Sequence, residues 1–322
     1  MEILNGNKNV TQNIFLFDWI SFSSQIHGPE ELIHELGLDD LEWQIIPGHK
    51  GYKDRFYYDS ISIHYNGREG MGVWCEMSGQ GCRVFETFGH GNYLRIFQLA
   101  ENNWGIHFTR VDIALDDHED LLDIQRLFDD TVKGNFVSKF KSHTYHGGTG
   151  GLSVEHGRKG SRTMMRIYDK AAERGYNDGK HWIRIEIQLR DERAEEFIKR
   201  YLFDSEKGLS VIFLGVLRNY IRYVVPDPDD SNRRRWPTAD YWDRLISSVT
   251  RIRLFVDLGI DYNMRKLEDY VIMQAGNAID AYIEIVGEKL FKERLKNRTV
   301  KRNMKYQYLV ARHAEYKKLT EI

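Results

Sequence analysis

Polar and apolar residues alternate in three segments of this chain, which is the pattern of β-strands that bury one face. Residues 163–170 form one such segment and place Arg166, Tyr168 and Lys170 on a common face. The polar faces of the other two segments carry Arg110, Asp112 and Asp116, and Arg184, Glu186, Gln188 and Arg190. Strands that bury Ile, Val and Leu on one side and line the other with arginine, carboxylate and tyrosine indicate a site that handles phosphate.

The chemistry that such a face supports is limited. A tyrosine hydroxyl can attack a phosphodiester and form a phosphotyrosine when the charge that grows on the phosphoryl oxygens is offset. Arginines offer paired contacts to phosphate. Carboxylate and amide oxygens are hard ligands that suit Mg²⁺ or Mn²⁺, and such an ion acts as Lewis acid and template.

Spacing along the strands favours one acid over another as a metal ligand. Asp112 and Asp116 share a face, but four residues of strand separate them by about 13 Å, which is too far to share an ion unless the strand bulges. We therefore favour Asp112. If the segments 163–170 and 182–190 pair as a hairpin, Tyr168 lies near the level of Glu186, on strands about 4.8 Å apart.

The remaining pattern indicates short strands and amphipathic helices. We expect strands, separated by Gly-rich turns, in the runs IFLFDWISFS, RFYYDSISIHYN, GVWCEMSG, GCRVFETF and GIHFTRVDIAL. We expect helices at 28–38, 92–100, 121–133, 194–202 and 209–220. This order predicts an α+β fold, a largely antiparallel sheet with helices covering one face. Strands, a helix and more strands occur in 14–100 and again in 105–220, which hints at two related halves.

A boundary is expected after residue 225, where the stretch VVPDPDDSNRRRWPTADYW holds three of the five prolines. Residues 1–225 then form a catalytic domain, and 226–322 a C-terminal helical region with a basic tail. We expect helices at 241–255 and 264–296, since apolar residues recur there at three- and four-residue spacing. An amphipathic helix of this kind suits the catalytic domain, a second copy in a homodimer, or a helicase as its packing partner.

Charge is distributed unevenly along the chain. The formal net charge is only −2, yet residues 289–318 contain eleven Lys or Arg against two Glu. Smaller basic clusters lie at 158–162 and 233–235. A basic tail of this kind is typical of contact with nucleic acid, and a solvated helix face is the alternative.

Length and composition limit the class of protein that this chain can be. The 322 residues are 41% hydrophobic, which is ample for a packed core. No run is long and apolar enough for a membrane span, and the first residues lack the layout of a secretory signal, so we expect a cytoplasmic protein with no membrane partner. Cys75 and Cys82 are too few for a disulfide framework, and we place them on a hairpin around 78–81.

The histidines argue against a metal site built on paired imidazoles. A His-x-His pair on one strand aligns two imidazoles for one ion, and none of the twelve histidines here is two residues from another. His143 and His146 are three apart in a Gly-rich loop, where solvent exposure is the simpler interpretation. A carboxylate-based metal site is therefore favoured.

Five strings, taken in order along the chain, carry a resemblance to a known family. They are MSGQGCRVFE, TRVDIALDD, GSRTMMRIYDKAAE, WIRIEIQLR and WPTADYWDRL. In this arrangement the chain resembles the Rep_trans family of rolling-circle replication initiators and the NicK-type relaxases of integrative elements. The resemblance spans about residues 14 to 260.

The resemblance implies roles for residues at the matching positions. The family tyrosine on the R-I-Y-D-K-like strand nicks one DNA strand at an origin and stays joined to the 5′ phosphate, and Tyr168 is at that position. Family carboxylates on neighbouring strands hold a divalent metal, Mg²⁺ or Mn²⁺, and they match Asp112 and Glu186, with Gln188 as a weaker match. Lys170 is expected to assist catalysis. The expected partners are single-stranded or hairpin origin DNA and a UvrD-like helicase.

Four arginines on these strands are the candidate phosphate-binding residues: Arg110, Arg166, Arg184 and Arg190. Alternating Arg and Glu on paired strands also suits a simple ladder of salt bridges. A metal-dependent nuclease that uses water would keep the acids and not need the tyrosine. A non-catalytic origin-binding protein would need neither.

Overall fold

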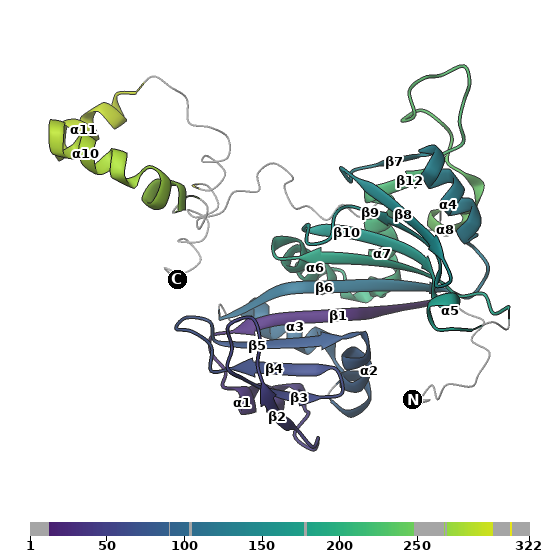
Figure 1. Cartoon of the computed structure of the whole chain (residues 1–322), viewed down its shortest axis with the longest axis horizontal. Coiled ribbons are helices and arrows are strands. Elements are labelled where there is room, and N and C mark those ends of the chain that lie inside the picture. The colour runs from purple at the N-terminus through teal and green to yellow at the C-terminus, as the bar shows by residue number, and fades with distance from the viewer. Residues whose placement is uncertain are drawn as a thin grey trace. The chain divides into compact units, whose positions relative to one another are not determined.

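Two compact units make up the chain. The structure is a computed structural model that describes residues 13–89, 91–102, 105–176, 179–247, 267, 269–298 and 310. The first unit spans Met1–Leu254 and the second Phe255–Ile322. Figure 1 labels the helices and strands of both units.

A ten-stranded antiparallel sheet forms the centre of the first unit, with the strand order β2-β3-β4-β5-β1-β6-β11-β10-β9-β8. Its first elements are β1 (Ile14–Ser24), α1 (Pro29–Leu36), β2 (Gln44–Pro47), β3 (Asp54–Tyr58), β4 (Ile61–Tyr65), β5 (Val73–Ser78), α2 (Gly79–Phe88) and α3 (Tyr93–Asn102). These are followed by β6 (Ile106–Asp117), α4 (Ile124–Lys133), β7 (Phe136–Ser138), β8 (His143–Gly148), β9 (Gly151–His156), β10 (Thr163–Asp169), α5 (Lys170–Glu173), β11 (Ile183–Arg190), α6 (Glu192–Phe203), a 3₁₀ turn (Ser205–Lys207), α7 (Gly208–Tyr220), β12 (Ile221–Tyr223) and α8 (Asp240–Ile246). The expected α+β class is confirmed.

The strand order is symmetric about the β1–β6 pair. From β1 the neighbours outward are β5, β4, β3 and β2, and from β6 they are β11, β10, β9 and β8. Each half begins with its central strand and a helix and continues with the four outer strands from the edge inward, with β7 and α5 as additions in the second half. Helices α2 and α3 follow in the first half, and α6 and α7 in the second. The expected two related halves are therefore present, with β4 and β5 as the counterparts of β10 and β11.

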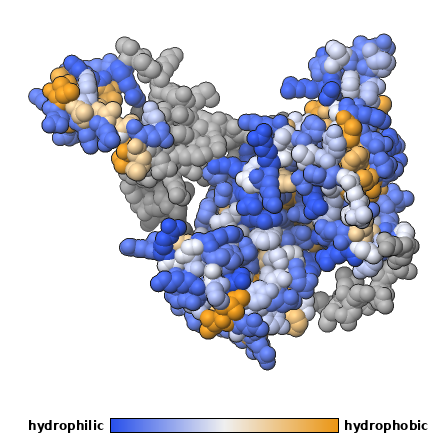
Figure 2. Space-filling model, viewed as in Figure 1, coloured by the Kyte–Doolittle hydropathy of each residue, from blue (hydrophilic) through white to orange (hydrophobic). Residues whose placement is uncertain are grey.

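The two faces of the sheet differ in chemistry. Alternate residues of the central strands, such as Val111, Ile113, Ile185 and Ile187, are buried in one hydrophobic core. Helices α2, α3, α6 and α7 contact the strands that supply this core. The sheet face turned toward the viewer in Figure 1 is the one that these helices leave uncovered, and Figure 2 shows it as predominantly hydrophilic. The polar residues of the alternating segments lie on this face.

One predicted strand is a helix. The run GCRVFETF lies in α2, and the expected hairpin at 78–81 is wrong because Ser78 is the N-cap of that helix. The run contains residues typical of strands, but Cys82 and Phe85, three apart, are both fully buried, which is helical spacing. A Cβ on Gly81 would lie 2.4 Å from the Ser60 carbonyl oxygen, so only glycine allows α2 to pack this close to the β3–β4 turn. Both cysteines are free and buried.

The region after residue 225 begins within the first unit. Helix α8 packs on the core there, with the Trp242 ring 4.9 Å from that of Tyr223. The helix expected at 241–255 is observed to Ile246, and residues 248–266 lie outside the described part of the chain. The division into units falls after residue 254. The catalytic boundary after 225 stays a prediction.

The second unit is helical where the structure describes it. A π-helix (Asp269–Gln274), α10 (Gly276–Val286) and α11 (Glu288–Lys296) replace the continuous helix expected at 264–296. The break before α11 falls at Gly287, whose φ of 82° is unfavourable for other residues. Most of the basic tail lies outside the described residues. No helix in the described ranges has the length and apolar character needed to cross a bilayer.

A buried carboxylate fixes the chain where β6 ends. Asp117 accepts backbone N–H bonds from Glu119 (3.1 Å), Leu121 (3.3 Å) and Leu122 (2.9 Å), and a ring N–H bond from His181 (3.1 Å). Burial alone would raise the pKa of Asp117, but these hydrogen bonds lower it. The hydrogen bond to Asp117, opposed by burial, raises the pKa of His181.

Replacing Asp117 with alanine is expected to lower the free energy of unfolding by about 2–4 kcal/mol, because the buried N–H of Leu122 and three partly buried donors lose their acceptor. The difference between the two proteins should shrink as the pH falls through the lowered pKa of Asp117, and again as it rises through the raised pKa of His181. Urea unfolding across pH measures both. Asp40→Ala, which removes an exposed carboxylate beyond α1, is the control, and an equal loss there would contradict this role for Asp117.

Candidate active site

Tyr168 and Glu186 lie beside each other on the polar face of the sheet. Strands β10 and β11 pair as the expected hairpin, with Tyr168 opposite Arg184 and Arg166 opposite Glu186. The phenol oxygen of Tyr168 donates to Glu186 Oε2 at 3.4 Å. The predicted approach of the tyrosine to an acid on the neighbouring strand is confirmed.

Cationic side chains surround the phenol. The guanidinium of Arg166 lies 4.1 Å from the centre of the Tyr168 ring. Lys170 was expected to continue the strand, but Asp169 caps α5 through the Ala172 N–H, and Lys170 is the first residue of that helix. Its amine still donates to the Tyr168 oxygen at 3.3 Å and pairs with Glu173. Tyr168 is only 3% exposed, so a phosphate reaches it only if neighbouring side chains move.

The electrostatic environment discourages spontaneous ionisation of this tyrosine. Burial, and then the charge of Glu186, raise the pKa of Tyr168 well above its usual value. Burial, and then the charges of Asp112 and Asp18, raise the pKa of Glu186. A raised pKa makes Glu186 a better proton acceptor than an ordinary carboxylate, and its oxygen is already hydrogen bonded to the phenol.

Asp18 is a third acid that the sequence pattern did not reveal. It lies in β1 at an irregularity between Phe17 and Trp19, where the register with β6 shifts. One of its oxygens accepts from Arg184 Nη1 at 2.8 Å. A strand bulge of this kind redirects a side chain, which simple alternation cannot anticipate.

Arg184 and Asp116 form a buried ion pair beside the tyrosine. Arg184 donates to both oxygens of Asp116, at 2.6 and 2.7 Å, in addition to its bond with Asp18. Asp116 is therefore held by an arginine, as Asp112 is held by Arg110, so the choice of Asp112 as the metal ligand stays a prediction. Phosphate binding by Arg184 stays a prediction, since three of its nitrogens already have carboxylate partners.

Asp112 is buried within a row of polar side chains on β6 and β11. Arg110 donates to both of its oxygens, and Gln188 Nε2 lies 3.5 Å from Oδ2. The Gln188 amide oxygen accepts from Arg190 at 2.9 Å. Burial raises the pKa of Asp112, and the bonds from Arg110 oppose that effect.

These acids offer the right donors for a hard cation but do not enclose one in this arrangement. Asp18, Asp112 and Glu186 are oxygen donors whose charges act on one another. Among the described residues, the acids and histidines whose ligand atoms come within 4.8 Å of one another in a group of three are His49, His64 and Glu76, in the other half. For Asp112 to coordinate an ion, Arg110 would have to release at least one of its oxygens.

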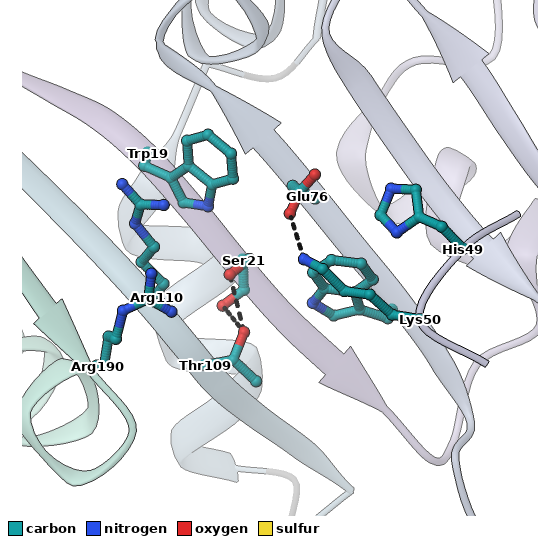
Figure 3. A pocket seen from close by; sticks show the side chains of 9 residues that line it. Trp19, Ser21, His49, Lys50, Glu76, Thr109, Arg110 and Arg190 are labelled. Atoms are coloured by element: carbon teal, nitrogen blue, oxygen red, sulfur yellow. Dashed lines mark hydrogen bonds and ion pairs between the residues drawn. The ribbon is translucent and has the colours of Figure 1, made fainter. Parts of the chain in front are cut away.

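A pocket of about 470 Å³ opens on the same face beside Arg110 (Figure 3). Its lining comprises Trp19, Ser21, His49, Lys50, Trp74, Glu76, Thr109, Arg110 and Arg190. Arg110 and Arg190 are opposite one another on adjacent strands, and the Arg110 guanidinium lies 4.1 Å from the Trp19 ring centre. Burial, and then the charge of Arg110, lower the pKa of Arg190, which indicates that this pair favours an anion.

Most residues that line this pocket were not predicted from the sequence, although they belong to alternating segments. Trp19 and Ser21 alternate with buried residues on β1, as Trp74 and Glu76 do on β5. The registers of β1 with β5 and β6 bring these positions into line with Arg110. Because the β1–β6 pairing joins the two halves, only the register shows that the polar faces form one surface.

Family comparisons cover both halves of the sheet. Residues 106–298 match the replication initiation factor family, Rep_trans, and residues 14–102 match the N-terminal domain of rolling circle replication initiation proteins. The junction between the two matches falls between α3 and β6, where the structure divides into its related halves.

Individual proteins show the same similarity. A protein described as DNA relaxase NicK, from Bacillus subtilis strain 168, is 31% identical over 262 residues, which cover 76% of this chain and 73% of the relative. The solved structure of a rolling circle replication initiator protein from Geobacillus stearothermophilus superposes with a TM-score of 0.68 at 28% identity. That match covers 76% of this chain and 98% of the other.

Proposed function

The chain belongs to the Rep_trans family of replication initiation factors, and from this premise we propose that it nicks and rejoins one DNA strand at an origin through Tyr168. The observation that supports the assignment most strongly is the contact of the Tyr168 hydroxyl with Glu186 and Lys170, at 3.4 and 3.3 Å. The hydroxyl of Tyr168 thus contacts both a proton acceptor, Glu186, and a cation, Lys170.

The proposed reaction is an in-line displacement at phosphorus. The Tyr168 oxygen forms a bond to the scissile phosphorus as its proton passes to Glu186, whose Oε2 already accepts a hydrogen bond from the phenol. The bond from phosphorus to the 3′ oxygen breaks, and that oxygen takes up a proton to become a free hydroxyl. The DNA on the other side stays joined to the protein through its 5′ phosphate. The new linkage conserves the energy of the phosphodiester, so the reverse reaction reseals the strand.

The cations have distinct proposed roles. Lys170, which touches the phenol oxygen, stabilises negative charge on the tyrosine and the phosphoryl group. Arg166 covers the ring with a partly exposed guanidinium, so an incoming phosphate can draw it away from Glu155 and Glu173, each 3.8 Å distant. Both groups are thereby placed to bind phosphate at the moment of attack.

A divalent ion is assigned to the acids of this site. We expect Asp112 and Glu186 to hold Mg²⁺ or Mn²⁺, with Gln188 or Asp18 as further oxygen donors. The ion would supply Lewis-acid polarisation of the scissile phosphate. An incoming phosphate also competes for Arg110, which frees Asp112 for the metal.

The pocket beside Arg110 is the proposed path of the DNA strand. Two guanidiniums, the Lys50 amine and two indole rings line it, and this combination suits phosphates with stacked bases. Single-stranded DNA, exposed by melting or extrusion of a hairpin, is the form that reaches such a pocket. The UvrD-like helicase and the homodimer stay predictions.

Replacing Arg190 with alanine is expected to weaken single-stranded DNA binding about tenfold, because one phosphate contact is lost. The slope of the logarithm of the affinity against the logarithm of the salt concentration should also fall in magnitude by about one. Fluorescence anisotropy across salt concentrations measures both. Arg95→Ala, which removes an arginine from helix α3, is the matched control, and an equal effect there would exclude a specific role for the pocket.

The proposed activity is tested with origin DNA labelled on the 3′ side of the nick. The DNA flanking the gene is a source of candidate origins, supplied single-stranded with Mn²⁺. Label that migrates with the protein on a denaturing gel supports the covalent mechanism. Cleavage without labelled protein would indicate a water-dependent nuclease, and binding without cleavage a non-catalytic origin-binding protein.

A further inference from the structure

We propose that His49, His64 and Glu76 bind one divalent transition-metal ion in the N-terminal half of the sheet, at a site separate from the tyrosine. His49 lies in the β2–β3 turn, His64 on β4 and Glu76 on β5. One ligand atom from each lies within 4.8 Å of the others. This arrangement does not depend on the proposed nicking reaction.

His64 gives the strongest indication of a missing ligand. Its side chain is fully buried, and neither ring nitrogen has a hydrogen-bond partner in the described part of the chain. Leaving buried polar atoms unpaired costs free energy, so native structures usually satisfy them. The Trp74 ring stacks on the imidazole at 4.7 Å between centres, and the His49 ring lies 4.3 Å away. These rings hold His64 in one place but accept no hydrogen bond in its plane.

The protonation state of His64 suits coordination. Burial, and then the charges of His49 and Arg55, lower the pKa of His64 to about 3. A neutral imidazole is the form that binds a metal, and among the described residues nothing else occupies the two ring nitrogens of His64.

The β2–β3 turn holds His49 in position. The Gly48 N–H donates to the Lys53 carbonyl at 2.8 Å, and the Tyr52 N–H donates to the His49 carbonyl at 3.1 Å. A Cβ on Gly48 would lie 2.7 Å from the Tyr52 carbonyl oxygen, so a larger residue would force this turn open. The imidazole of His49 is thus directed over β4 by a closed backbone and not by a loose loop.

Glu76 completes the set and leaves an open side. Its carboxylate lies 3.6 Å from the exposed amine of Lys50, and the metal would compete with that weak pair. His49 and Glu76 also line the pocket shown in Figure 3. A metal held by three protein ligands at the pocket wall would keep coordination positions for water or a phosphate oxygen.

The ligand chemistry differs from that of the tyrosine site. Two imidazoles with one carboxylate favour Zn²⁺ and its transition-metal neighbours, whereas the acids around Tyr168 are oxygen donors that suit Mg²⁺. Strand β5 is also three strands from β11, about 14 Å across the sheet. By the symmetry of the halves, β4 and β5 correspond to β10 and β11, so His64 and Glu76 occupy the counterparts of the strands that carry Tyr168 and Glu186.

Zinc binding by the full chain tests this proposal. The protein is stripped with a chelator, equilibrated with excess Mg²⁺ to fill sites made only of oxygen ligands, and titrated with Zn²⁺. We expect about one Zn²⁺ per chain, with two imidazole ligands in its X-ray absorption spectrum. His49→Ala and Glu76→Gln should each weaken binding by about tenfold or more, and Zn²⁺ should raise the melting temperature of the parent but not of the variants.

A surface histidine provides the control. His34 lies against Asp39 at 3.2 Å on the exposed side of α1, so His34→Ala removes another histidine–carboxylate pair and should leave zinc binding unchanged. His49 and Glu76 are only half-buried, so both variants are expected to fold, and circular dichroism verifies it. Absence of stoichiometric zinc, a spectrum without imidazole, or unchanged affinity in folded His49→Ala and Glu76→Gln would overturn the proposal.

Discussion

Tyr168→Phe is expected to lose covalent attachment to DNA completely and to reduce strand nicking by at least about 10³-fold, because phenylalanine has no nucleophilic oxygen. The substitution removes one atom from a buried side chain and leaves the ring contact with Arg166 possible. Binding of single-stranded DNA should therefore change little. Nicking rates under single-turnover conditions, together with anisotropy, separate the two effects.

Tyr176→Phe is the matched control for that experiment. Tyr176 follows α5 and is exposed, so its hydroxyl is accessible, and no carboxylate among the described residues is hydrogen bonded to it. It should nick at the parent rate. A Tyr168→Phe protein that still forms the adduct would rule out Tyr168 as the nucleophile, and one that cleaves without an adduct would favour the water-dependent reaction.

Glu186→Gln is expected to reduce nicking by about 10²–10⁴-fold while leaving DNA bound. The amide keeps the shape of the side chain but is a poor proton acceptor and a weak ligand for Mg²⁺ or Mn²⁺. Since the variant weakens the metal site as well as the base, raising the Mn²⁺ concentration should restore only part of the rate. Single-turnover nicking across a Mn²⁺ titration measures this.

Glu195→Gln is the matched control for Glu186→Gln. Glu195 lies on α6 and contacts His107, away from the polar row that carries the tyrosine. Its variant should nick normally. Full activity of Glu186→Gln at ordinary Mn²⁺ would mean that Glu186 is only part of a salt-bridge ladder, the alternative that the alternating pattern left open.

The central part of this site could be predicted because it depends on local alternation. Period-two patterns place Tyr168 and Glu186 on the same face of their strands, and the two strands pair as a hairpin across the connection 170–182. The strand register then decides which residues meet. Spacing along the strand favoured Asp112 over Asp116 as the metal ligand, and this choice stays a prediction, since the structure places each acid against an arginine.

The parts that could not be predicted depend on irregularity or on long-range pairing. Asp18 enters the site through a shift in the register of β1, which has no clear signature in the sequence. The α2 run has the composition of a strand, and its helical state is decided by tertiary packing around Gly81. His49, His64 and Glu76 come from three separate strands or turns, so a search for closely spaced histidines could not find them.

The most direct test of the Tyr168 assignment is mass spectrometry of the trapped protein–DNA adduct after digestion with nuclease and trypsin. Cleavage after Arg166 and Lys170 releases residues 167–170, a peptide in which Tyr168 is the single tyrosine. We predict that this peptide carries the mass of the 5′-linked nucleotide remnant. The same mass on a different peptide, or an unmodified 167–170 peptide from DNA-linked protein, would contradict the assignment.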